Sequence, residues 1–503
     1  MPHAALTLDP HFTVGAVNRR LFGSFVEHLG RCVYDGIYEP THPTADESGF
    51  REDVLELVRE LGVSTIRYPG GNFVSGFRWE DSIGPKASRP SRLDLAWHST
   101  EPNEVGIDEF AGWLAKTGSE LMYAVNLGTR GVQEALDVLE YANIRSGTAL
   151  SDARIANGRV KPYGVTMWCL GNEMDGPWQL GHRSADDYGK IASRTAKAMR
   201  QLDPSVELIV CGSSSAQMPT FGSWEHTVLE HTYDDVDFIS CHAYYEEVGG
   251  DTGSFLASAV NMDHFIESVI ATADSVGAQL KSSKKINISF DEWNVWYQSR
   301  YHDVDQITGI ENWPVAPRLL EDCYSVLDAV VVGSLLISLL KHADRVTSAS
   351  LAQLVNVIAP IMTEPGGPAW RQTTFFPFAI TSRLATGVAL EVKLESDSYT
   401  TRKYGEVATV DAVATHDAAT GRTAIFLVNR SLNAPTTVSV DVSQLGRVSV
   451  SEVHMLADDD ISAQNTLQDQ DRVAVRGNDS AVIAGGTLTI TLPAVSWAAI
   501  ELA

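Results

Sequence analysis

The chain has 503 residues, of which 44% are hydrophobic and 20% charged, so it is long enough for two domains and ordinary for a globular protein. Its formal net charge of −26 argues against nucleic acid or an anionic membrane surface as a partner, because both are negatively charged. A neutral carbohydrate would be indifferent to this field.

The N-terminus and the cysteines indicate a cytoplasmic protein. The first ten residues lack the basic start and the apolar run of a secretory signal. The longest mostly apolar run, 329–340, is too short to cross a bilayer and is better explained as a buried helix. The five cysteines are scattered and include no Cys-x-x-Cys pair, so we expect reduced thiols.

The first predicted element is a strand at 5–14, which precedes the repeating part of the chain. A lone strand outside a barrel needs a sheet to pair with. We therefore expect residues 1–17 to join a sheet that is formed by the C-terminal part of the chain.

Residues 18–384 alternate short apolar runs with amphipathic stretches, which predicts a parallel α/β fold. Helices are expected at 53–61, 108–117, 132–144, 185–202, 262–276 and 318–340. Strands are expected at 21–26, 64–68, 121–126, 165–170, 208–212, 238–242, 286–290 and 348–354. Eight strands with intervening helices are the number of a (β/α)8 TIM barrel, and we expect this barrel to be the catalytic domain.

The pattern changes in residues 385–503. Segments at 423–428, 436–442, 448–455 and 487–492 are rich in Val, Thr and Ile and are separated by turn residues. Antiparallel strands at this spacing predict a C-terminal β-sandwich of the jelly-roll type.

Polar side chains stand where six of the predicted barrel strands end. Active sites of such barrels lie at the C-terminal ends of the strands, so these side chains should meet at one mouth. They are Glu27 and His28, Arg67 and Asn72, Asn172 and Glu173, His242 and Tyr244, Glu292, and Gln353.

Glu173 and Glu292 follow the fourth and seventh strands, which lie across the barrel from each other. Two facing carboxyl groups can divide the work of cleaving a glycosidic bond: one donates a proton to the leaving oxygen and the other attacks the anomeric carbon. Retention of configuration requires the two groups to be about 5–5.5 Å apart. The alternative is that each is an ordinary ion-paired carboxylate.

The neighbouring residues have both functional and structural interpretations. Asn172 can donate to a sugar hydroxyl or simply form a turn, and Arg67 can bind substrate or hold Glu292 ionised. Trp97, Trp178, Trp293 and Trp296 can be platforms for sugar rings or parts of the core. For His28 and His242 we expect hydrogen bonds to carboxylates and no metal, because the spacings typical of metal ligands are missing.

Five longer strings resemble the α-L-arabinofuranosidases of glycoside hydrolase family 51. The resemblance spans nearly the whole chain. The strings are FGSFVEH at 22–28, RYPGGNFVSG at 67–76, WCLGNEMDGPWQ at 168–179, FDEWNVWY at 290–297 and AQLVNVIAPIM at 352–362.

The resemblance implies an intracellular exo-acting glycosidase that works by double displacement with retention and releases terminal arabinofuranose from arabino- and arabinoxylo-oligosaccharides. We expect no cofactor. The resemblance matches Glu173 to the acid/base and Glu292 to the nucleophile. It also implies a homo-oligomer, often a hexamer. The residues it matches to sugar binding are Glu27, Asn72, Asn172, Tyr244, Trp296 and Gln353.

Two other functions remain open at this stage. An endo-acting β-glycanase or xylanase would use the same barrel with an open groove, and a non-catalytic carbohydrate-binding protein would use the fold without chemistry. Phe77, Arg78 and the segment 298–317 depart from the family pattern, which leaves the preferred linkage and aglycone open.

Overall fold

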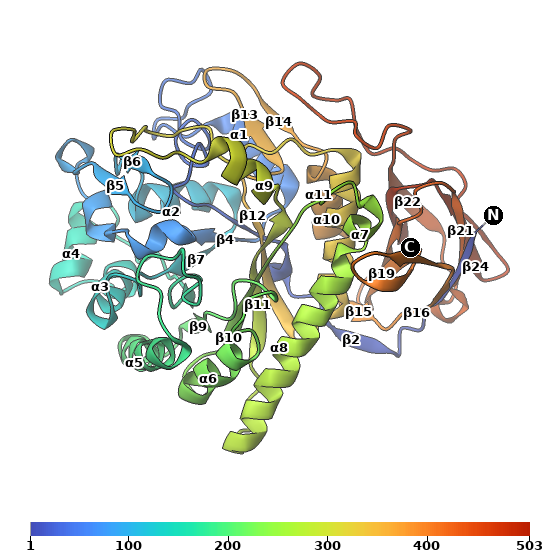
Figure 1. The fold of residues 1–503 in the computed structure, drawn as a ribbon, viewed down its shortest axis with the longest axis horizontal. Helices are drawn as coiled ribbons and strands as arrows, with labels where there is room; N and C mark the ends of the chain where they lie inside the picture. The colour runs from blue at the N-terminus through green and yellow to red at the C-terminus, as the bar shows by residue number, and fades with distance from the viewer. Residues whose placement is uncertain (1) are drawn as a thin grey trace.

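The computed structural model describes residues 2–503 and consists of a closed barrel beside a domain made of two β-sheets (Figure 1). All eight predicted barrel strands are present, so the predicted fold class is confirmed. In the order of the closed barrel they are β10 (Phe238–Tyr245), β11 (Asn287–Val295), β12 (Val346–Ala352), β3 (Gly23–Phe25), β4 (Thr65–Tyr68), β7 (Glu120–Ala124), β8 (Met167–Cys169) and β9 (Glu207–Val210). Neighbouring strands pair in parallel.

Helices alternate with the barrel strands, and the longer ones cover the outside of the barrel (Figure 1). They are α1 (Glu52–Leu61), α2 (Ile107–Thr117), α3 (Val132–Asn143), α4 (Ala149–Ala156), α5 (Ala185–Leu202), α6 (Ser223–Thr232), α7 (Thr252–Leu256), α8 (Ser258–Leu280), α9 (Gln298–Arg300), α10 (Val326–Lys341) and α11 (Phe375–Leu384). None of the helices among residues 2–503 has both the length and the apolar character needed to cross a membrane.

The last long predicted helix was placed too early. The sequence predicts helix over 318–340, but α10 begins at Val326. Ser325 caps its N-terminus, because its hydroxyl accepts from the backbone N–H of Asp328 while the Asp328 side chain accepts from the Ser325 N–H. This capping box fixes the start of the helix, and the residues before it form an irregular connection.

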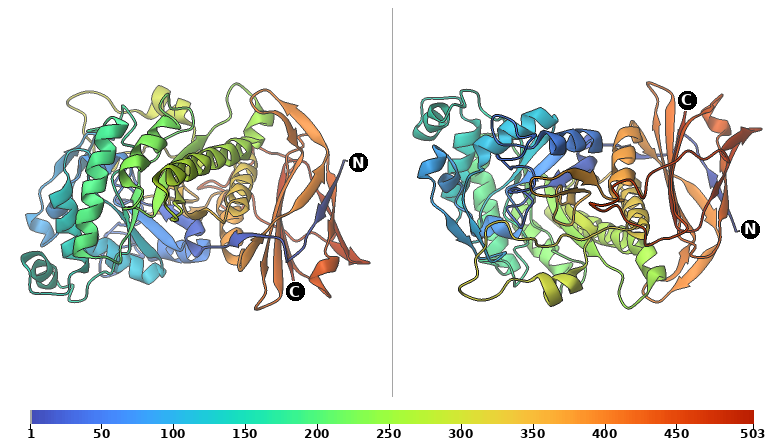
Figure 2. Two further views of the ribbon diagram at one scale, coloured as in Figure 1. Left: turned by 90° about the horizontal axis from the view of Figure 1, so that it is seen from below. Right: turned by 90° about the horizontal axis from the view of Figure 1, so that it is seen from above.

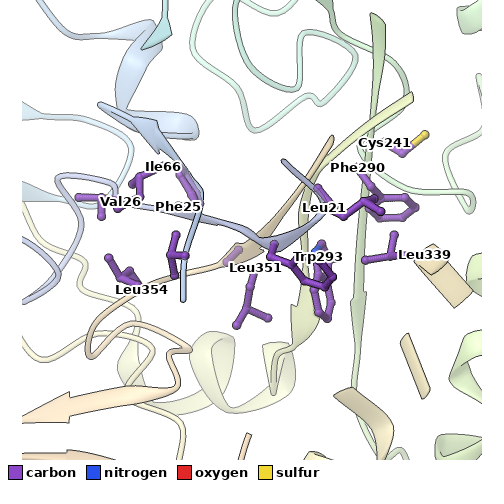
Figure 3. Packing of buried hydrophobic residues seen from close by; sticks show 14 of the residues in the cluster. Leu21, Phe25, Val26, Ile66, Cys241, Phe290, Trp293, Leu339, Leu351 and Leu354 are labelled. Carbon is purple, nitrogen blue, oxygen red and sulfur yellow. The ribbon is translucent and has the colours of Figure 1, made fainter. Parts of the chain in front are cut away.

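Helix α10 is the main link between the two domains. Nearly every residue along it is buried, because the barrel lies on one side and the β domain on the other (Figure 2). Leu339 of α10 belongs to the same apolar cluster as Phe290, Trp293 and Leu351 (Figure 3). The long apolar run that could have suggested a membrane segment is therefore explained by burial on all sides.

The C-terminal domain is a pair of sheets. One has the order β16 (Lys393–Ser396), β1 (His3–Thr7), β21 (Thr436–Asp441), β24 (Thr487–Leu492) and β23 (Val482–Ala484). The other has the order β2 (Thr13–Ala16), β15 (Val388–Leu390), β19 (Val410–Asp417), β20 (Arg422–Asn429), β25 (Ser496–Leu502) and β22 (Val450–Leu456). Alternate side chains of both sheets form a separate apolar core.

The N-terminal segment differs from the single strand predicted at 5–14. It forms two strands that enter different sheets: β1 pairs with β16 and β21, and β2 pairs with β15. The chain turns between them, where the Asp9 side chain accepts from the His11 N–H. The pairing of β1 with β21 is parallel, so the domain is not purely antiparallel as predicted.

Shorter hairpins complete the chain. They are β5 (Arg92–Asp94) with β6 (Ser99–Glu101), β13 (Ile361–Thr363) with β14 (Ala369–Arg371), and β17 (Ser398–Thr401) with β18 (Gly405–Ala408). The first of them belongs to the long connection from β4 to α2, at the mouth of the barrel.

Two barrel strands continue further than predicted. β10 runs to Tyr245 and β11 to Val295, so Glu292 lies within its strand rather than after it. The pairing register shifts between Phe290 and Trp293 where β11 meets β12. Such a bulge re-aims the side chains near it, and this one includes Glu292.

Candidate active site

The predicted site residues come from six barrel strands or from the residues that follow them, all at the C-terminal end of the barrel. Glu27 follows β3, Arg67 lies in β4 and Asn72 starts the next short helix, Asn172 and Glu173 follow β8, Tyr244 lies in β10, Glu292 in β11, Trp296 follows β11, and Gln353 follows β12. Direct contacts and shared partners link all of them into one cluster.

Glu173 and Glu292 face each other. Both are buried, and an oxygen of one lies within 4.8 Å of an oxygen of the other. Carboxyl groups that invert configuration are about 6.5–9.5 Å apart to admit a water molecule, whereas retaining pairs are closer. The separation here is that of a pair that can act on one anomeric carbon.

Glu292 is held at both oxygens by donors. Arg67 Nη1 donates to Oε1 at 2.7 Å, and the Tyr244 hydroxyl donates to Oε2 at 2.7 Å. Burial raises the pKa of Glu292 above its ordinary value, while the cations of His242 and Arg67 oppose this. The predicted role of Arg67 as a partner of Glu292 is thus seen directly.

Glu173 is also held at both oxygens, by different groups. His242 Nδ1 lies 2.9 Å from Oε1, and the indole N–H of Trp178 donates to Oε2 at 2.7 Å. Glu173 has a φ of 42°, in the left-handed region that residues with a Cβ rarely adopt. The turn after β8 therefore holds this carboxyl in an unusual backbone conformation.

His242 connects Glu173 to a third buried carboxylate that the sequence analysis missed. Its Nε2 lies 2.9 Å from Asp291 Oδ1. Burial disfavours the charged ring, but the charge of Glu292 and the hydrogen bonds to Asp291 and Glu173 raise the pKa of His242 well above its ordinary value. The ring is therefore an imidazolium among three carboxylates.

Asp291 and Glu292 are adjacent in β11, and adjacent strand residues normally point to opposite faces. The bulge between Phe290 and Trp293 breaks that alternation, so both carboxylates contact the same cluster. Alternation alone could not reveal this. In the sequence, the one indication was that Asp291 stands next to Glu292 with no basic residue beside it.

Glu27 forms a second corner of the site. Its oxygens accept from the Phe73 N–H at 2.9 Å, the Trp97 indole at 2.9 Å and the Gln353 amide at 3.1 Å. Burial raises the pKa of Glu27 to about 8, although the hydrogen bonds from Phe73 and Trp97 oppose the shift. At neutral pH this group can both donate to and accept from a sugar hydroxyl.

The two glycines after β4 make room for the carboxylates. A Cβ on Gly70 would lie 2.9 Å from Glu27 Cγ. One on Gly71 would lie 3.1 Å from Glu292 Oε1 and 3.4 Å from Glu27 Oε2. The absence of side chains at these two positions therefore lets Glu27 and Glu292 approach the same space.

Three amides form a third side of the site. Asn172 Oδ1 accepts from Arg67 Nη2 at 2.6 Å, and its Nδ2 donates to Asn72 Oδ1 at 3.2 Å and to Gln179 Oε1 at 3.4 Å. Gln179 ends the string at 168–179, but no pattern in the sequence marked it as a site residue. Its contact to Asn172 shows why a polar residue stands there.

The four tryptophans have different surroundings. Trp293 is fully buried in the core, so the platform interpretation is wrong for it. Trp97 is buried against Glu27, and Trp296 is half-buried with its ring 5.0 Å from that of Tyr244. Trp178 is 53% exposed at the mouth. Trp178 and Trp296 are thus the two of the four that are not fully buried.

The two histidines contact carboxylates, as expected. His28 Nδ1 lies 2.9 Å from Glu101. Glu173, His242 and Glu292 are the group among residues 2–503 whose geometry could hold a metal ion. Both nitrogens of His242 already face carboxylate oxygens, and a ring protonated at both has no lone pair for a cation. The donor set therefore fits proton chemistry better than metal binding.

A parallel barrel with two buried, facing glutamates at its C-terminal mouth, surrounded by amides and aromatic rings, is typical of glycoside hydrolases. Within that class, this chain is further characterised by its C-terminal β domain and by the continuous cluster of polar side chains around Glu173 and Glu292.

Comparisons with known proteins agree with this class. Residues 57–250 match the family model "Alpha-L-arabinofuranosidase 1 domain" and residues 291–496 match "Alpha-L-arabinofuranosidase C-terminal domain". The chain is 59% identical over 511 residues to an exo-α-(1→6)-L-arabinofuranosidase of Bifidobacterium longum, covering 100% of this chain and 98% of the relative. It is 60% identical over 505 residues to an intracellular exo-α-(1→5)-L-arabinofuranosidase of Streptomyces lividans. That match covers 100% of this chain and 76% of the relative.

Solved structures give the same result. A family 51 α-L-arabinofuranosidase from Bifidobacterium longum matches with a TM-score of 0.96 and 50% identity over 100% of both chains. An α-L-arabinofuranosidase from Thermotoga maritima, solved as an arabinose complex, matches with a TM-score of 0.88 and 32% identity over 99% of both chains. The chain belongs to the α-L-arabinofuranosidases of glycoside hydrolase family 51.

Proposed function

We propose that the protein is an exo-acting, retaining glycosidase that releases terminal non-reducing α-L-arabinofuranosyl residues from oligosaccharides by double displacement. The observation that supports it most is the separation of Glu173 and Glu292, whose oxygens lie within 4.8 Å of each other. Family membership supports the substrate class, because the relatives above are named exo-α-L-arabinofuranosidases.

In the first step Glu292 attacks the anomeric carbon as its bond to the glycosidic oxygen breaks. Glu173 gives its proton to that oxygen, and the alcohol leaves. In the second step Glu173 removes a proton from water, the water oxygen attacks the anomeric carbon, and Glu292 is released as a carboxylate. Two inversions at one carbon give net retention.

The surrounding polar groups suit a furanose ring. Glu27, Asn72, Asn172 and Gln353 lie around the carboxylates and offer both donors and acceptors for sugar hydroxyls. Tyr244 donates to Glu292 and contacts the ring of Trp296. We assign sugar binding to Glu27, Asn72, Asn172, Gln353, Tyr244 and Trp296. Arg67 holds Glu292 and Asn172 in place.

The relatives suggest which bond is cleaved. One is named for α-(1→6) linkages and several for α-(1→5) linkages. O5 of an arabinofuranose and O6 of a hexopyranose are both primary oxygens on an exocyclic CH2 group. We propose that this protein prefers arabinofuranosides attached to such a primary oxygen.

A comparison of two disaccharides tests the linkage. We expect kcat/KM on α-(1→5)-linked arabinobiose to exceed that on an arabinofuranose linked α-(1→3) to xylose by about tenfold or more, since unfavourable contacts of 1–3 kcal/mol have effects of this size. Equal rates on the two would contradict the preference. Release of xylose chains from an undecorated xylan would instead indicate an endo-acting xylanase.

The names of the relatives support a proposal on cellular location, and the family resemblance supports one on assembly. Several of them are named intracellular, which supports a cytoplasmic enzyme that acts on small imported oligosaccharides. We also propose that the chain forms a homo-oligomer, as the family resemblance suggested. Light scattering on the purified protein should then give a mass several times 54.7 kDa, with a hexamer expected.

The Glu292→Ala variant tests the nucleophile. We expect turnover of an aryl α-L-arabinofuranoside to fall by about four orders of magnitude or more, because no group remains to form the covalent intermediate. Azide should fit the space left by the carboxylate and restore activity, giving the β-azide of inverted configuration. Near-native turnover by this variant would show that Glu292 is not the nucleophile.

The Glu173→Ala variant tests the acid. An activated aryl leaving group needs little protonation, so the loss in kcat/KM on an aryl arabinofuranoside should be far smaller than the loss on arabinobiose. Similar losses on both substrates would contradict the assignment.

A further inference from the structure

The contact between Trp178 and Glu173 poses a chemical problem. Both oxygens of Glu173 receive an N–H donor, Oε1 from His242 and Oε2 from Trp178. Donors of this kind stabilise the ionised form of a carboxyl group. The first step of the proposed reaction, on which this inference rests, needs the opposite: a protonated oxygen facing the glycosidic oxygen.

Moving one of the two donors away when substrate binds would favour the protonated form of Glu173, and the surroundings of the two donors differ. His242 is buried, and its other nitrogen is fixed by Asp291 at 2.9 Å. Trp178 is 53% exposed, and its indole N–H to Glu173 is its only hydrogen bond from the side chain among residues 2–503. Trp178 is the donor that can leave.

The turn is built to hold the indole over Glu173. A Cβ on Gly176 would lie 2.5 Å from Cε2 of Trp178 and 2.9 Å from its Nε1. The indole of Trp178 thus folds back across Gly176 onto the carboxylate of Glu173, which precedes both in the chain. This close approach exists only because residue 176 has no side chain.

We propose that Trp178 is a positioning residue that switches Glu173 between its two roles through a removable hydrogen bond. With the leaving-group side empty, the indole N–H holds Oε2 as the acceptor that a general base needs. When the leaving sugar occupies that side, it displaces the indole, and Oε2 takes up a proton from solvent and faces the glycosidic oxygen.

The proton balance is closed over the cycle. The proton that Oε2 gains passes to the departing alcohol. Once the alcohol has left, the indole returns and stabilises the carboxylate that then accepts a proton from water. That proton goes to solvent, so Trp178 itself neither gains nor loses one.

Two variants with different chemistry test the switch. Trp178→Phe removes the N–H and keeps an aromatic ring, and Gly176→Ala keeps the indole but displaces it from Glu173. In both, the free enzyme loses a donor that favours ionised Glu173. The basic limb of the pH profile of kcat/KM on arabinobiose should move to higher pH by about 0.5–1 unit, the size expected for one hydrogen bond to a charged group.

The acidic limb provides an internal control, because it reports Glu292, which Trp178 does not contact, and it should not move. Trp313→Phe is the matched variant: its indole N–H donates at 2.7 Å to the carbonyl of Ile310 rather than to a carboxylate. Its pH profile should keep both limbs where the unmodified protein has them.

A second measurement compares the pH profile of the substrate complex with that of the free enzyme. The basic limb of kcat, which reports the substrate complex, should lie above that of kcat/KM in the unmodified protein, and the gap should close in Trp178→Phe. A basic limb that stays in place in both variants, or moves to lower pH, would overturn the inference. If the unmodified protein fails to release arabinose, or Glu173→Ala lacks the leaving-group effect, it is the proposed function that fails instead.

Discussion

At the scale of single residues, the two glutamates are distinguished by the groups that hold them. Glu292 receives a fixed guanidinium and a phenol, both from barrel strands, whereas Glu173 receives one buried imidazolium and one exposed indole. Hydrogen-bond donors that stay in place stabilise the ionised form of a carboxyl group, which is the form that a nucleophile such as Glu292 needs before reaction. The difference in partners thus agrees with the difference in proposed roles.

The Tyr244→Phe variant tests this account of Glu292. The Tyr244 hydroxyl lowers the pKa of Glu292, so its loss should raise that pKa further. Because Glu292 must be ionised to attack, the acidic limb of kcat/KM should move to higher pH, by about 0.5–1 unit for one hydrogen bond. Stopped assays across the pH range measure the limb.

Tyr245→Phe is the control for that experiment. Tyr245 is the next residue of β10, and its buried hydroxyl has no hydrogen-bond partner in the described part of the chain. Its profile should be unchanged. An acidic limb that is the same in Tyr244→Phe and in the unmodified protein would contradict the role of Tyr244.

Glu27 predicts a pH dependence of stability. Its folded pKa of about 8 lies above the ordinary value of 4.5. A raised pKa means that its contribution to stability is fully present below pH 4.5 and is lost as the pH rises through 8. Glu27→Gln cannot ionise, so its free energy of unfolding relative to the unmodified protein should improve between pH 6 and pH 9, about this pKa.

Urea titrations at several pH values measure this difference. A constant difference across the range would mean that Glu27 does not titrate there. Asp459→Asn, at an exposed position of the β domain, is the comparison and should show no such trend.

The residues of the site were predicted unequally. Glu173 and Glu292 could be recognised because each ends an apolar run and is flanked by Trp and Asn. Asp291 was missed because strand alternation assigns it to the opposite face, and only the bulge in β11 brings it to His242. The bond from Trp178 to Glu173 depends on a turn conformation that composition does not encode.

At the scale of elements, the strand ends decide where the chemistry lies. The turn after β4 places Gly71 so that a Cβ on it would lie 3.1 Å from Glu292 Oε1 and 3.4 Å from Glu27 Oε2. Glu27 directly follows β3 and Glu292 lies in β11, and both strands are fixed by the barrel register, so there is little room for an added methyl group.

The Gly71→Ala variant tests this packing. The added Cβ would lie 3.1 Å from Glu292 Oε1 and should displace the nucleophile. We expect kcat/KM to fall by about 10–100-fold, since small misplacements of reacting groups have effects of this size. Gly477→Ala, where a Cβ would meet nothing within 4 Å, is the control, and equal activities of the two variants would contradict the argument.

The elements themselves were largely predictable because short apolar runs and amphipathic periods are local signals. The residues at which helices and strands start and end were less predictable. The start of α10 depends on the capping box at Ser325, and the break between β1 and β2 falls at Asp9-Pro10, a turn signal that the apolar residues around it obscured. Strand partners, such as β21 for β1, depend on the whole sheet.

At the scale of the whole molecule, α10 and a buried charge cluster join the two domains. Asp411 of β19 accepts hydrogen bonds from Arg430, from Lys341 at the end of α10, and from Ser334 of α10 at 2.8 Å. Although burial opposes it, the charges of Arg430 and Lys341 lower the pKa of Asp411 to about 2. The cluster ties the helix to the β-sheet that packs on it.

The Asp411→Ala variant should destabilise the protein by about 3 kcal/mol or more, because it leaves Arg430 buried without its partner. The lowered pKa means that this contribution is present above pH 4 and is lost as the pH falls towards about 2. Urea unfolding at neutral pH measures the change. Asp459→Ala, on an exposed loop, is the control, and a loss in Asp411→Ala no larger than in the control would contradict the coupling.

The most direct test of the central claim is to find where the sugar becomes attached. In Glu173→Ala, an aryl α-L-arabinofuranoside with a good leaving group should form the covalent intermediate quickly and hydrolyse it slowly, because the general base is missing. Mass spectrometry of the digested protein should then find one pentosyl group on the peptide that contains Glu292. A pentosyl group on another residue, or rapid release of inverted arabinose without any adduct, would contradict the account.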